Sequence, residues 1–345
     1  MSPVTINILK INPNLNIGAL PAKVNDFEII EQIPAGFAQH RVLRSQYALE
    51  VTLHNIIKDY PFLQASPQDA DIIFVPIYTF CLAWRKPYIY DVGAIVESIH
   101  TLLDQLTRYA AAGHKVLIPY SDVMWPDSRC FMHHFKFHKN FFFVAYERAD
   151  PNDNVIVVPY CTHIKANPIA YPIPCDQNRN HIICYAGRPR KEISRFESIE
   201  SYYTENHDPN KWISLNSIEN YNNIDSMYLN SFFSLQPHGD RKTRRGFYHS
   251  LLLGCIPVIF TNTADAYREV FDKVVPIEEI AVIIDTESRD PIRKLIEQLP
   301  TWKRRIANVE KIKNLLLYED GELGIVKNII EKIESLISAR SGSNH

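Results

Sequence analysis

The residues whose types and spacing most clearly suggest ligand binding lie in the stretch FFSLQPHGDRKTRRGFYHSLLLGCIPVIF, positions 232 to 260. A Pro-His-Gly-Asp loop at 237–240 is followed by a cluster of Arg and Lys and then by an apolar segment. Gly239 allows either a positive φ or a close approach of the backbone to a ligand. Because ligands of open α/β sheets bind outside the carboxyl ends of the strands, a loop directly after the strand 232–237 is predicted to face a ligand.

A helix is predicted after this loop, with Thr243 as its N-cap, and it runs to Leu253. Arg244 and Arg245 would then lie in its first turn, where positive charge is unfavourable against the helix dipole unless an anion lies between. The free amide groups of a helix N-terminus bind anions for the same reason. A diphosphate group would therefore suit this helix start, although a basic surface in contact with water alone would produce the same sequence.

A second loop favours the ligand over the solvated surface. In CYAGRPRKEISR, Gly187 directly follows a predicted strand, and Arg188 and Arg190 precede a predicted helix. Two strand-to-helix loops of one sheet therefore each carry glycine and arginine. We expect these loops to converge on one anionic site at the carboxyl ends of the strands.

The rest of the chain must position these loops. It has 345 residues, of which 46% are hydrophobic and 22% charged, and this is typical of a globular protein long enough for two domains. The formal net charge of -2 argues against a general nucleic-acid binder, because such binding needs a broad excess of Lys and Arg. The basic cluster is therefore a local feature.

Apolar runs alternate with amphipathic segments in two blocks, which predicts two α/β domains with buried parallel sheets. Strands are predicted at 71–76, 115–120, 140–146, 154–160, 181–187, 212–216, 232–237 and 256–260. Helices are predicted at 40–60, 93–112, 192–204, 223–230 and 243–254. Prolines and asparagines without periodicity mark a connection between the blocks. The expected organisation is an N-terminal domain at 1–165, a linker at 166–180, a C-terminal domain at 181–322, and a helix and tail at 323–345 that pack back on the N-terminal domain.

The segment SLQPHGDRKTRRGFYHSLLLGCIPVIF resembles the signature of exostosin-like glycosyltransferases, family 47, in which a P-x-G-D loop precedes a Ser/Thr-x-Arg helix start and an A-G-C-I-P-V-I strand. The LQP...TRR form is most similar to the plant cell-wall branch of that family. Further matches are QYALEVTLHNIIKDYPFLQASPQDADIIFVPIY at 46–78, AGRPR at 186–190 and VIVVPY at 155–160. The resemblance covers most of residues 40–335.

This resemblance implies an α/β fold of the GT-B type, with two Rossmann-like, doubly wound domains facing each other across a cleft. It also implies inverting transfer of a sugar from a UDP-linked donor, held by the C-terminal domain, without a metal ion or other cofactor. Matched onto this sequence, the family motif assigns donor binding to Gly187, Arg188, Arg190, Pro237, His238, Gly239, Asp240, Thr243, Arg244 and Arg245. Glu269, in AYREVF, falls near an acidic position of the family whose carboxylate could accept ribose hydroxyls. The sequence departs from the family pattern at His238, where Arg or Pro is frequent, and at His249, where Asp is frequent.

An inverting reaction needs a base that accepts the proton of the acceptor hydroxyl, and a carboxylate or His on the N-terminal, acceptor-side domain suits that role. Glu147 is the first candidate, because it directly follows the strand 140–146 and roughly aligns with an acidic residue of a family FFV-x-x-H-D segment. A glutamate at a strand end that contacts only water fits the sequence nearly as well. Asp122, after KVLIPYS, and Asp127 are the alternatives, and each is also a common turn residue near Pro126.

Three other groups of reactive residues are interpreted as structural. Asp69 and Asp71 form a D-x-D pattern, but they precede their strand rather than follow it. His134 and His138 have helical i, i+4 spacing without a third metal ligand. Cys255 starts an apolar strand without recognisable His and Asn partners, so it is interpreted as a packing residue. No metal site is predicted.

These inferences predict a glycosyltransferase that moves xylose, galactose, arabinose or glucuronic acid from a UDP donor to a hydroxyl of an oligosaccharide or polysaccharide acceptor. The alternatives are a non-catalytic nucleotide-sugar or glycan-binding subunit of a glycosyltransferase complex, and an α/β phosphorylase or nucleotide-binding regulator. The sequence shows no signal peptide, membrane-length apolar run or CxxC pair. We therefore expect either a cytoplasmic protein, such as the soluble family members that large algal viruses encode, or the soluble catalytic part of a secretory-pathway enzyme.

Overall fold

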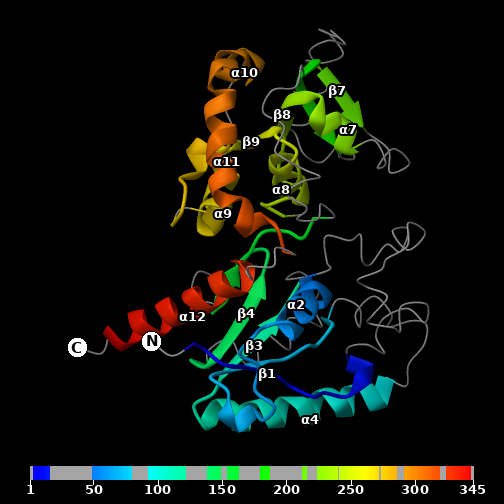
Figure 1. The fold of residues 1–345 in the computed structure, drawn as a ribbon. Helices are drawn as coiled ribbons and strands as arrows, with labels where there is room; N and C mark the ends of the chain where they lie inside the picture. Colours follow the sequence, from blue (N-terminus) through cyan, green and yellow to red (C-terminus); the bar gives the residue numbers. More distant parts are fainter. Residues whose placement is uncertain are drawn as a thin grey trace. The chain divides into compact units, whose positions relative to one another are not determined.

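The chain forms two compact units in the computed structural model. Unit 1 comprises Met1–His163 and Tyr318–His345, and unit 2 comprises Ile164–Leu317 (Figure 1). The structure describes residues 3–15, 49–79, 92–121, 138–148, 154–162, 179–186, 212–215, 224–239, 241–271, 273–285, 291–318 and 324–342. Most of the linker predicted at 166–180 lies outside these ranges, and the described strands of each unit form one five-stranded parallel sheet.

The described strands of unit 1 lie side by side in chain order, β1-β2-β3-β4-β5. They are β1 (Ile6–Ile8), β2 (Ile72–Phe74), β3 (Lys115–Pro119), β4 (Phe141–Ala145) and β5 (Val155–Val157). All of their side chains are buried except Ile8 and Lys115, which are partly exposed. Continuous apolar strands of this kind are typical of a parallel sheet that is covered on both faces.

Helices pack against this sheet and complete unit 1. They are α2 (Leu49–Lys58), α4 (Val92–Ala111) and α12 (Gly324–Gly342), with short 3-10 turns η1 (Pro13–Leu15) and η5 (Pro67–Asp69). Both α2 and α4 contact β3, and α12 contacts β5. Gly113 adopts a φ of 98° after α4, a conformation that glycine adopts without strain. The helix predicted at 93–112 and its stop at Gly113 are confirmed.

The end of the chain returns to unit 1. The Lys332 ammonium group donates a hydrogen bond to the Val157 carbonyl over 2.8 Å, and the Tyr318 hydroxyl group donates one to the Pro159 carbonyl. Both acceptors lie at or just beyond the carboxyl end of β5. The red helix α12 in Figure 1 is therefore part of the same unit as the N-terminal sheet.

The sheet of unit 2 reverses its winding, with the order β10-β9-β8-β6-β7. Its strands are β6 (His181–Ala186), β7 (Trp212–Leu215), β8 (Ser231–Leu235), β9 (Ile256–Phe260) and β10 (Val282–Ile284). The chain first adds β7 on one side of β6 and then adds β8, β9 and β10 on the other side. This reversal creates a switch point between the carboxyl ends of β6 and β8, which is where open α/β sheets bind ligands.

Five described helices belong to unit 2. They are α7 (Ile224–Leu229), α8 (Arg245–Leu252), α9 (Thr261–Phe271), α10 (Pro291–Gln298) and α11 (Trp302–Leu316), with 3-10 turns η7 (Ile277–Glu279) and η8 (Leu299–Thr301). The connection from β8 to β9 runs through α8, and α11 packs against α8.

The end of α8 is a tight turn that leads directly into β9. Gly254, with a φ of 70°, donates its amide hydrogen to the Leu251 carbonyl over 3.0 Å, and Cys255 donates to the Ser250 carbonyl over 2.9 Å. This pair of bonds is the Schellman pattern, which satisfies the last carbonyls of a helix and needs a left-handed residue. The Trp302 indole then donates to the Gly254 carbonyl over 3.1 Å, so α11 holds the same turn.

Two buried arginines in unit 2 bind carbonyl groups. Arg179 donates to the carbonyls of Tyr228, Ser231 and Leu253, and its guanidinium carbon lies 4.9 Å from the centre of the Trp302 ring. Burial lowers the pKa of this guanidinium. The carbonyl dipoles solvate the charge of the buried guanidinium group. Through these three bonds Arg179, which lies in the segment predicted as a linker, connects α7, β8 and the end of α8.

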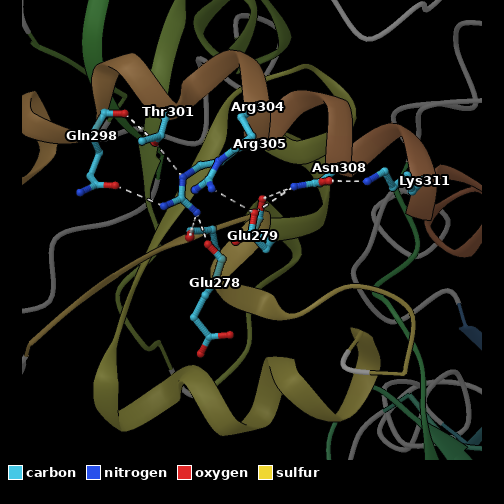
Figure 2. Close-up of polar contacts among 9 residues, drawn as sticks. Glu278, Glu279, Gln298, Thr301, Arg304, Arg305, Asn308 and Lys311 are labelled. Carbon is cyan, nitrogen blue, oxygen red and sulfur yellow. Dashed lines mark hydrogen bonds and ion pairs between the residues drawn. The ribbon is translucent and has the colours of Figure 1, made fainter.

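Arg305 has the corresponding role between α11 and η7. Figure 2 shows its guanidinium group close to the backbone near Glu278 and to the side chains of Gln298 and Thr301. It donates to the carbonyls of Glu278 and Ala281, to Gln298 Oε1 over 3.2 Å and to Thr301 Oγ1 over 3.1 Å. The guanidinium group thus connects α11 to η7 and to the segment just before β10.

Most of the fold follows the sequence prediction. Every predicted strand is present, the α/β class with two Rossmann-like domains is confirmed, and so are the helices at 223–230 and 243–254. The helix predicted at 40–60 is described from Leu49, whereas the one at 192–204 lies outside the described residues. The sequence analysis did not predict β1, β10, α9, α10 or α11.

Candidate functional site

Arg244 joins the carboxyl ends of the two strands at the switch point of unit 2. Its Nη2 donates to the Ala186 carbonyl over 3.0 Å, at the end of β6, and its Nη1 donates to the Pro237 carbonyl over 3.4 Å, just after β8. The guanidinium carbon lies 5.4 Å from the centre of the Tyr185 ring. The two loops that were predicted to share a site therefore leave the sheet beside one arginine side chain.

The start of α8 differs from the prediction. Arg244 is the N-cap, with φ of -136° and ψ of 142°, and Arg245 is the first helical residue. Thr243, which was predicted as the cap, is buried one residue earlier. The Tyr267 hydroxyl oxygen on α9 accepts the amide hydrogen of Arg244 over 3.0 Å. Because the Arg244 backbone is extended, the helix begins after it, and only Arg245 of the two arginines lies in the first turn.

Gly239 lies beside open space in the loop after β8. Its φ is not positive, and no heavy atom of the described residues lies within 4 Å of a Cβ built on it. Its amide donates to the Arg241 carbonyl over 3.0 Å, and Nδ1 of His238 lies 3.2 Å from the Gly239 carbonyl oxygen. Neither backbone conformation nor packing within the described chain requires glycine here. Glycine at this position leaves room for a ligand to approach the backbone.

Gly246 has the opposite environment, because it brings α8 close to the end of β8. A Cβ at this position would lie 2.8 Å from Gln236 Oε1, which is closer than real Cβ atoms come, and 3.0 Å from the Tyr228 hydroxyl oxygen, which is a tight contact. Gln236 directly follows β8 and is buried. The sequence analysis did not single out Gln236. The signal that could have found it is a glycine just inside a helix start, since glycine is unfavourable in helices by about 1 kcal/mol relative to Ala.

The structure assembles part of the predicted donor site. Around the switch point it brings together Pro237, His238, Gly239, Thr243, Arg244 and Arg245. Gly187, Arg188, Arg190 and Asp240 lie outside the described residues. Glu269 lies on α9 with an exposed side chain, two residues after the tyrosine that contacts Arg244.

Unit 1 carries the predicted base at the carboxyl edge of its sheet. Glu147 follows β4 and is partly exposed, so a ligand hydroxyl group at this edge could reach it. The residue before it, Tyr146, is buried and stacks on Tyr160, with ring centres 3.9 Å apart. Burial raises the pKa of Tyr146 well above its usual value, so this phenol stays protonated. Asp122 and Asp127, the alternative bases, lie outside the described residues.

Glu50 is a second carboxylate at this edge, and the sequence analysis did not single it out. It lies in the first turn of α2 and is completely buried. Its Oε1 accepts hydrogen bonds from the Thr79 hydroxyl group and, over 3.2 Å, from the Ser121 amide. These donors follow β2 and β3, respectively. A glutamate between the apolar residues Leu49 and Val51 of the helix is the signal that could have revealed it.

The described residues that were interpreted as structural have structural contacts, whereas His134 lies outside the described residues. Asp71 accepts hydrogen bonds from the amide and the hydroxyl group of Thr5, both over 2.8 Å, and these bonds lower its pKa. Nδ1 of His138 accepts the Asn140 amide over 3.3 Å. Cys255 is buried, and burial raises the pKa of its thiol, which disfavours the reactive thiolate. No three His, Cys, Asp or Glu side chains gather as metal ligands would within the described ranges.

The two edges offer different chemistry. The edge of unit 2 presents arginine and the start of a helix, which suit an anion such as a diphosphate. The edge of unit 1 presents the Glu147 carboxylate, which suits proton acceptance and binding of hydroxyl groups. Among the described helices, none combines the length and the apolar character needed to cross a bilayer.

Comparison with known proteins agrees with this chemistry. The probable xyloglucan galactosyltransferase GT14 of Arabidopsis thaliana is 25% identical over 250 residues, which cover 65% of this chain and 47% of that protein. The xyloglucan-specific galacturonosyltransferase 1 of the same plant is 26% identical over 269 residues, which cover 70% of this chain and 39% of that protein. The chain thus spans less than half the length of these two relatives.

Among solved structures, Anabaena HepE in complex with UDP-glucose is 10% identical, with a TM-score of 0.41 over 97% of this chain and 100% of that chain. The family described as Exostosin GT47 domain matches residues 4–299, a range that contains the strands of both sheets. With its arginine-bearing switch point inside that range, the chain belongs to the exostosin GT47 family of glycosyltransferases.

Proposed function

We propose that this chain transfers a sugar from a UDP-linked donor to a hydroxyl group of a glycan, with inversion at the anomeric carbon and without a metal ion. The observation that carries the proposal is the switch point of unit 2, where Arg244 joins the ends of β6 and β8 at the start of α8. Switch points and helix N-termini both favour phosphate-bearing ligands. Family membership supports the reaction class.

The donor half of the site would stabilise the leaving group. As the bond between the anomeric carbon and the diphosphate oxygen breaks, negative charge grows on UDP. Arg245, at the first residue of α8, and the open backbone beside Gly239 are the described groups that would meet this charge. Arg188 and Arg190 are proposed to complete the cradle. Fixed guanidinium groups would replace the cation that other transferases use.

The acceptor half would remove a proton. We assign this role to Glu147, because it is a partly exposed carboxylate at the carboxyl edge of the sheet in unit 1. The acceptor oxygen would attack the anomeric carbon on the face opposite UDP, and its proton would pass to the Glu147 carboxylate. Asp122 is the alternative base.

The names of the relatives guide the choice of substrates. One of them is named a probable xyloglucan galactosyltransferase, and the other a xyloglucan-specific galacturonosyltransferase. We therefore propose UDP-galactose as the first donor to test and UDP-galacturonic acid as the second, with xyloglucan oligosaccharides as acceptors. UDP-xylose, UDP-arabinose and UDP-glucuronic acid complete the panel that the sequence predicts.

The test is NMR-monitored turnover of this panel by the purified chain in EDTA. The expected result is selective consumption of one donor and a product whose anomeric configuration is opposite to that of the donor. Retained configuration would contradict the inverting mechanism, and turnover restored only by Mn²⁺ would contradict metal independence. Binding of UDP without consumption of any donor would favour the alternative of a non-catalytic binding subunit, or indicate that the acceptors in the panel do not fit the site.

A further inference from the structure

One buried carboxylate connects two strand ends in unit 1. Glu50 reaches from α2 to the segments that follow β2 and β3, where its Oε1 accepts hydrogen bonds from the Thr79 hydroxyl group and the Ser121 amide. Thr79 and Ser121 are thus held at a single oxygen atom. Ser121 is 71 residues from Glu50 in the sequence, so only the folded unit creates this connection.

Burial of this carboxylate is unfavourable for the fold. The Glu50 side chain has no exposed surface, and its helix neighbours Leu49 and Val51 are buried as well. Transfer of an ionised carboxylate out of water costs several kcal/mol or more, and an apolar residue of similar size is often at least as stable in such a place. Packing alone does not explain why a glutamate occupies this position. A role in holding the geometry of a site would explain it.

The edge that Glu50 organises has unsatisfied polar atoms. Ser121 Oγ, after β3, and Thr162 Oγ1, after β5, are buried and make no hydrogen bond within the described structure. Buried polar atoms normally have a partner, so these hydroxyl groups call for a water molecule or a ligand. Glu147, at the end of β4 between those two strands, is the proposed base.

We propose that Glu50 is a positioning residue of the acceptor half of the active site. It holds the segments after β2 and β3 so that Ser121 and the neighbouring edge can receive a polyhydroxyl acceptor close to Glu147. Glu50 acts through Thr79 and Ser121, because its own carboxylate is covered. This inference rests on the proposed function.

The first test compares steady-state kinetics of Glu50→Gln and Thr79→Val with those of the wild-type chain, using UDP-galactose and xyloglucan oligosaccharides. Both variants keep the side-chain volume. The expected result is a loss of about tenfold or more in kcat/KM for the acceptor, because a small misplacement at an active site has effects of this size or larger. The Kd for UDP, measured by calorimetry, is expected to stay unchanged, since unit 2 would bind UDP.

Asp71→Asn is the matched control. Asp71 also accepts two hydrogen bonds that join neighbouring strands, but it lies at the amino end of β2, away from the proposed site. Its substitution is expected to change neither constant. If Glu50→Gln lowers the melting temperature but leaves acceptor kcat/KM unchanged for the folded enzyme, Glu50 is only structural. Should Glu50→Gln fail to fold, Thr79→Val carries the test alone.

A second readout does not depend on turnover. Hydrogen exchange of the amides at 75–79 and 117–121 is expected to accelerate in Glu50→Gln, while amides at 141–145 in β4 keep their protection. Unchanged exchange at 75–79 and 117–121 would overturn the positioning role. A wild-type chain that consumes no donor would overturn the proposed function instead, so the two failures are separate.

Discussion

The carboxyl edges of the two sheets use one structural device with opposite charge. In unit 2, Arg244 joins the ends of β6 and β8 by donating to the carbonyls of Ala186 and Pro237. In unit 1, Glu50 joins the segments after β2 and β3 by accepting from a hydroxyl group and an amide. In both places one ionic side chain forms hydrogen bonds with neutral groups of two different loops.

Under the proposed function, the two edges would supply the two halves of a transfer reaction. The parallel sheets place loops at one edge whatever their sequence, and the side chains at the edge decide which chemistry follows. An edge with arginine and a helix start favours an anionic leaving group, whereas an edge with carboxylates favours removal of a proton. Variants of each edge therefore test whether the assignment of the two halves is correct.

The largest effect is expected from Glu147→Gln. If Glu147 is the base, kcat falls by roughly 10²–10⁴, because general-base catalysis contributes a factor of this size. The melting temperature should change little, since the side chain is partly exposed. Turnover of the best donor under saturating conditions measures the effect. An unchanged kcat would reject the assignment, and Asp122→Asn would then be the next variant.

Arg245→Gln is expected to lower kcat by roughly 10²–10³, the usual loss when one electrostatic stabiliser of a transition state is removed. Arg244→Gln should lower both activity and stability, because two carbonyls lose their charged donor. Turnover and thermal unfolding of the two variants separate a phosphate ligand from an arginine that positions loops. Equal losses of stability in both variants would contradict this division of roles.

The acid response of unit 1 is expected to depend on His54. Burial, with a smaller contribution from Lys58, lowers the pKa of His54 to about 4 from 6.5, and its Nδ1 lies 2.8 Å from the Tyr78 hydroxyl oxygen. A neutral histidine in the folded state stabilises the protein above pH 6.5, and this stability is lost as the pH falls from 6.5 towards 4. The full difference is about 3 kcal/mol.

Urea unfolding between pH 7 and pH 4 measures this dependence, with His54→Gln as the comparison. The variant should lose less stability over that range than the wild-type chain. Parallel pH profiles of the two proteins would show that His54 does not titrate with unfolding.

The two glycines near α8 provide the smallest expected effects and a matched pair. Gly246→Ala should destabilise the protein by about 1–3 kcal/mol, as overpacking usually does, because its Cβ would meet Gln236 and Tyr228. Gly239→Ala should leave stability within about 0.5 kcal/mol, as at other open surface positions, but weaken UDP binding. Thermal unfolding and calorimetric UDP titration distinguish them. Normal UDP affinity in Gly239→Ala would remove this glycine from the donor site.

Much of the fold could be predicted because its signals are local. The strand 141–145 reads FFFVA and the strand 256–260 reads IPVIF, and both are apolar runs of strand length. Gly113 and Gly254 end α4 and α8 with the positive φ that the sequence leads one to expect at helix ends. The strands β1 and β10 were missed, and strand length does not explain this, because β2 and β5 also have three residues each and were predicted.

The candidate site was predictable in its residue types but not in its contacts. A glycine and arginines after two strands indicated an anion site, and the structure places the ends of those strands side by side. The predicted helix start was wrong by one residue, since Arg244 has an extended backbone and donates its amide hydrogen to Tyr267, 23 residues away in the sequence. Glu50 was missed because its two donors come from distant segments that no local pattern connects.

By itself, the sequence determined the α/β class, the two blocks of strands and helices, the positively charged loop after β8 and the family. These properties depend on periodicity, turn residues and motifs within a few neighbouring positions. Only the tertiary structure decided the reversed strand order of unit 2, the use of Arg244 as a connection between two loops, and the burial of Glu50 between two strand ends. The physical reason is that parallel pairing joins segments far apart in the chain, so their contacts exist only after the sheets have formed.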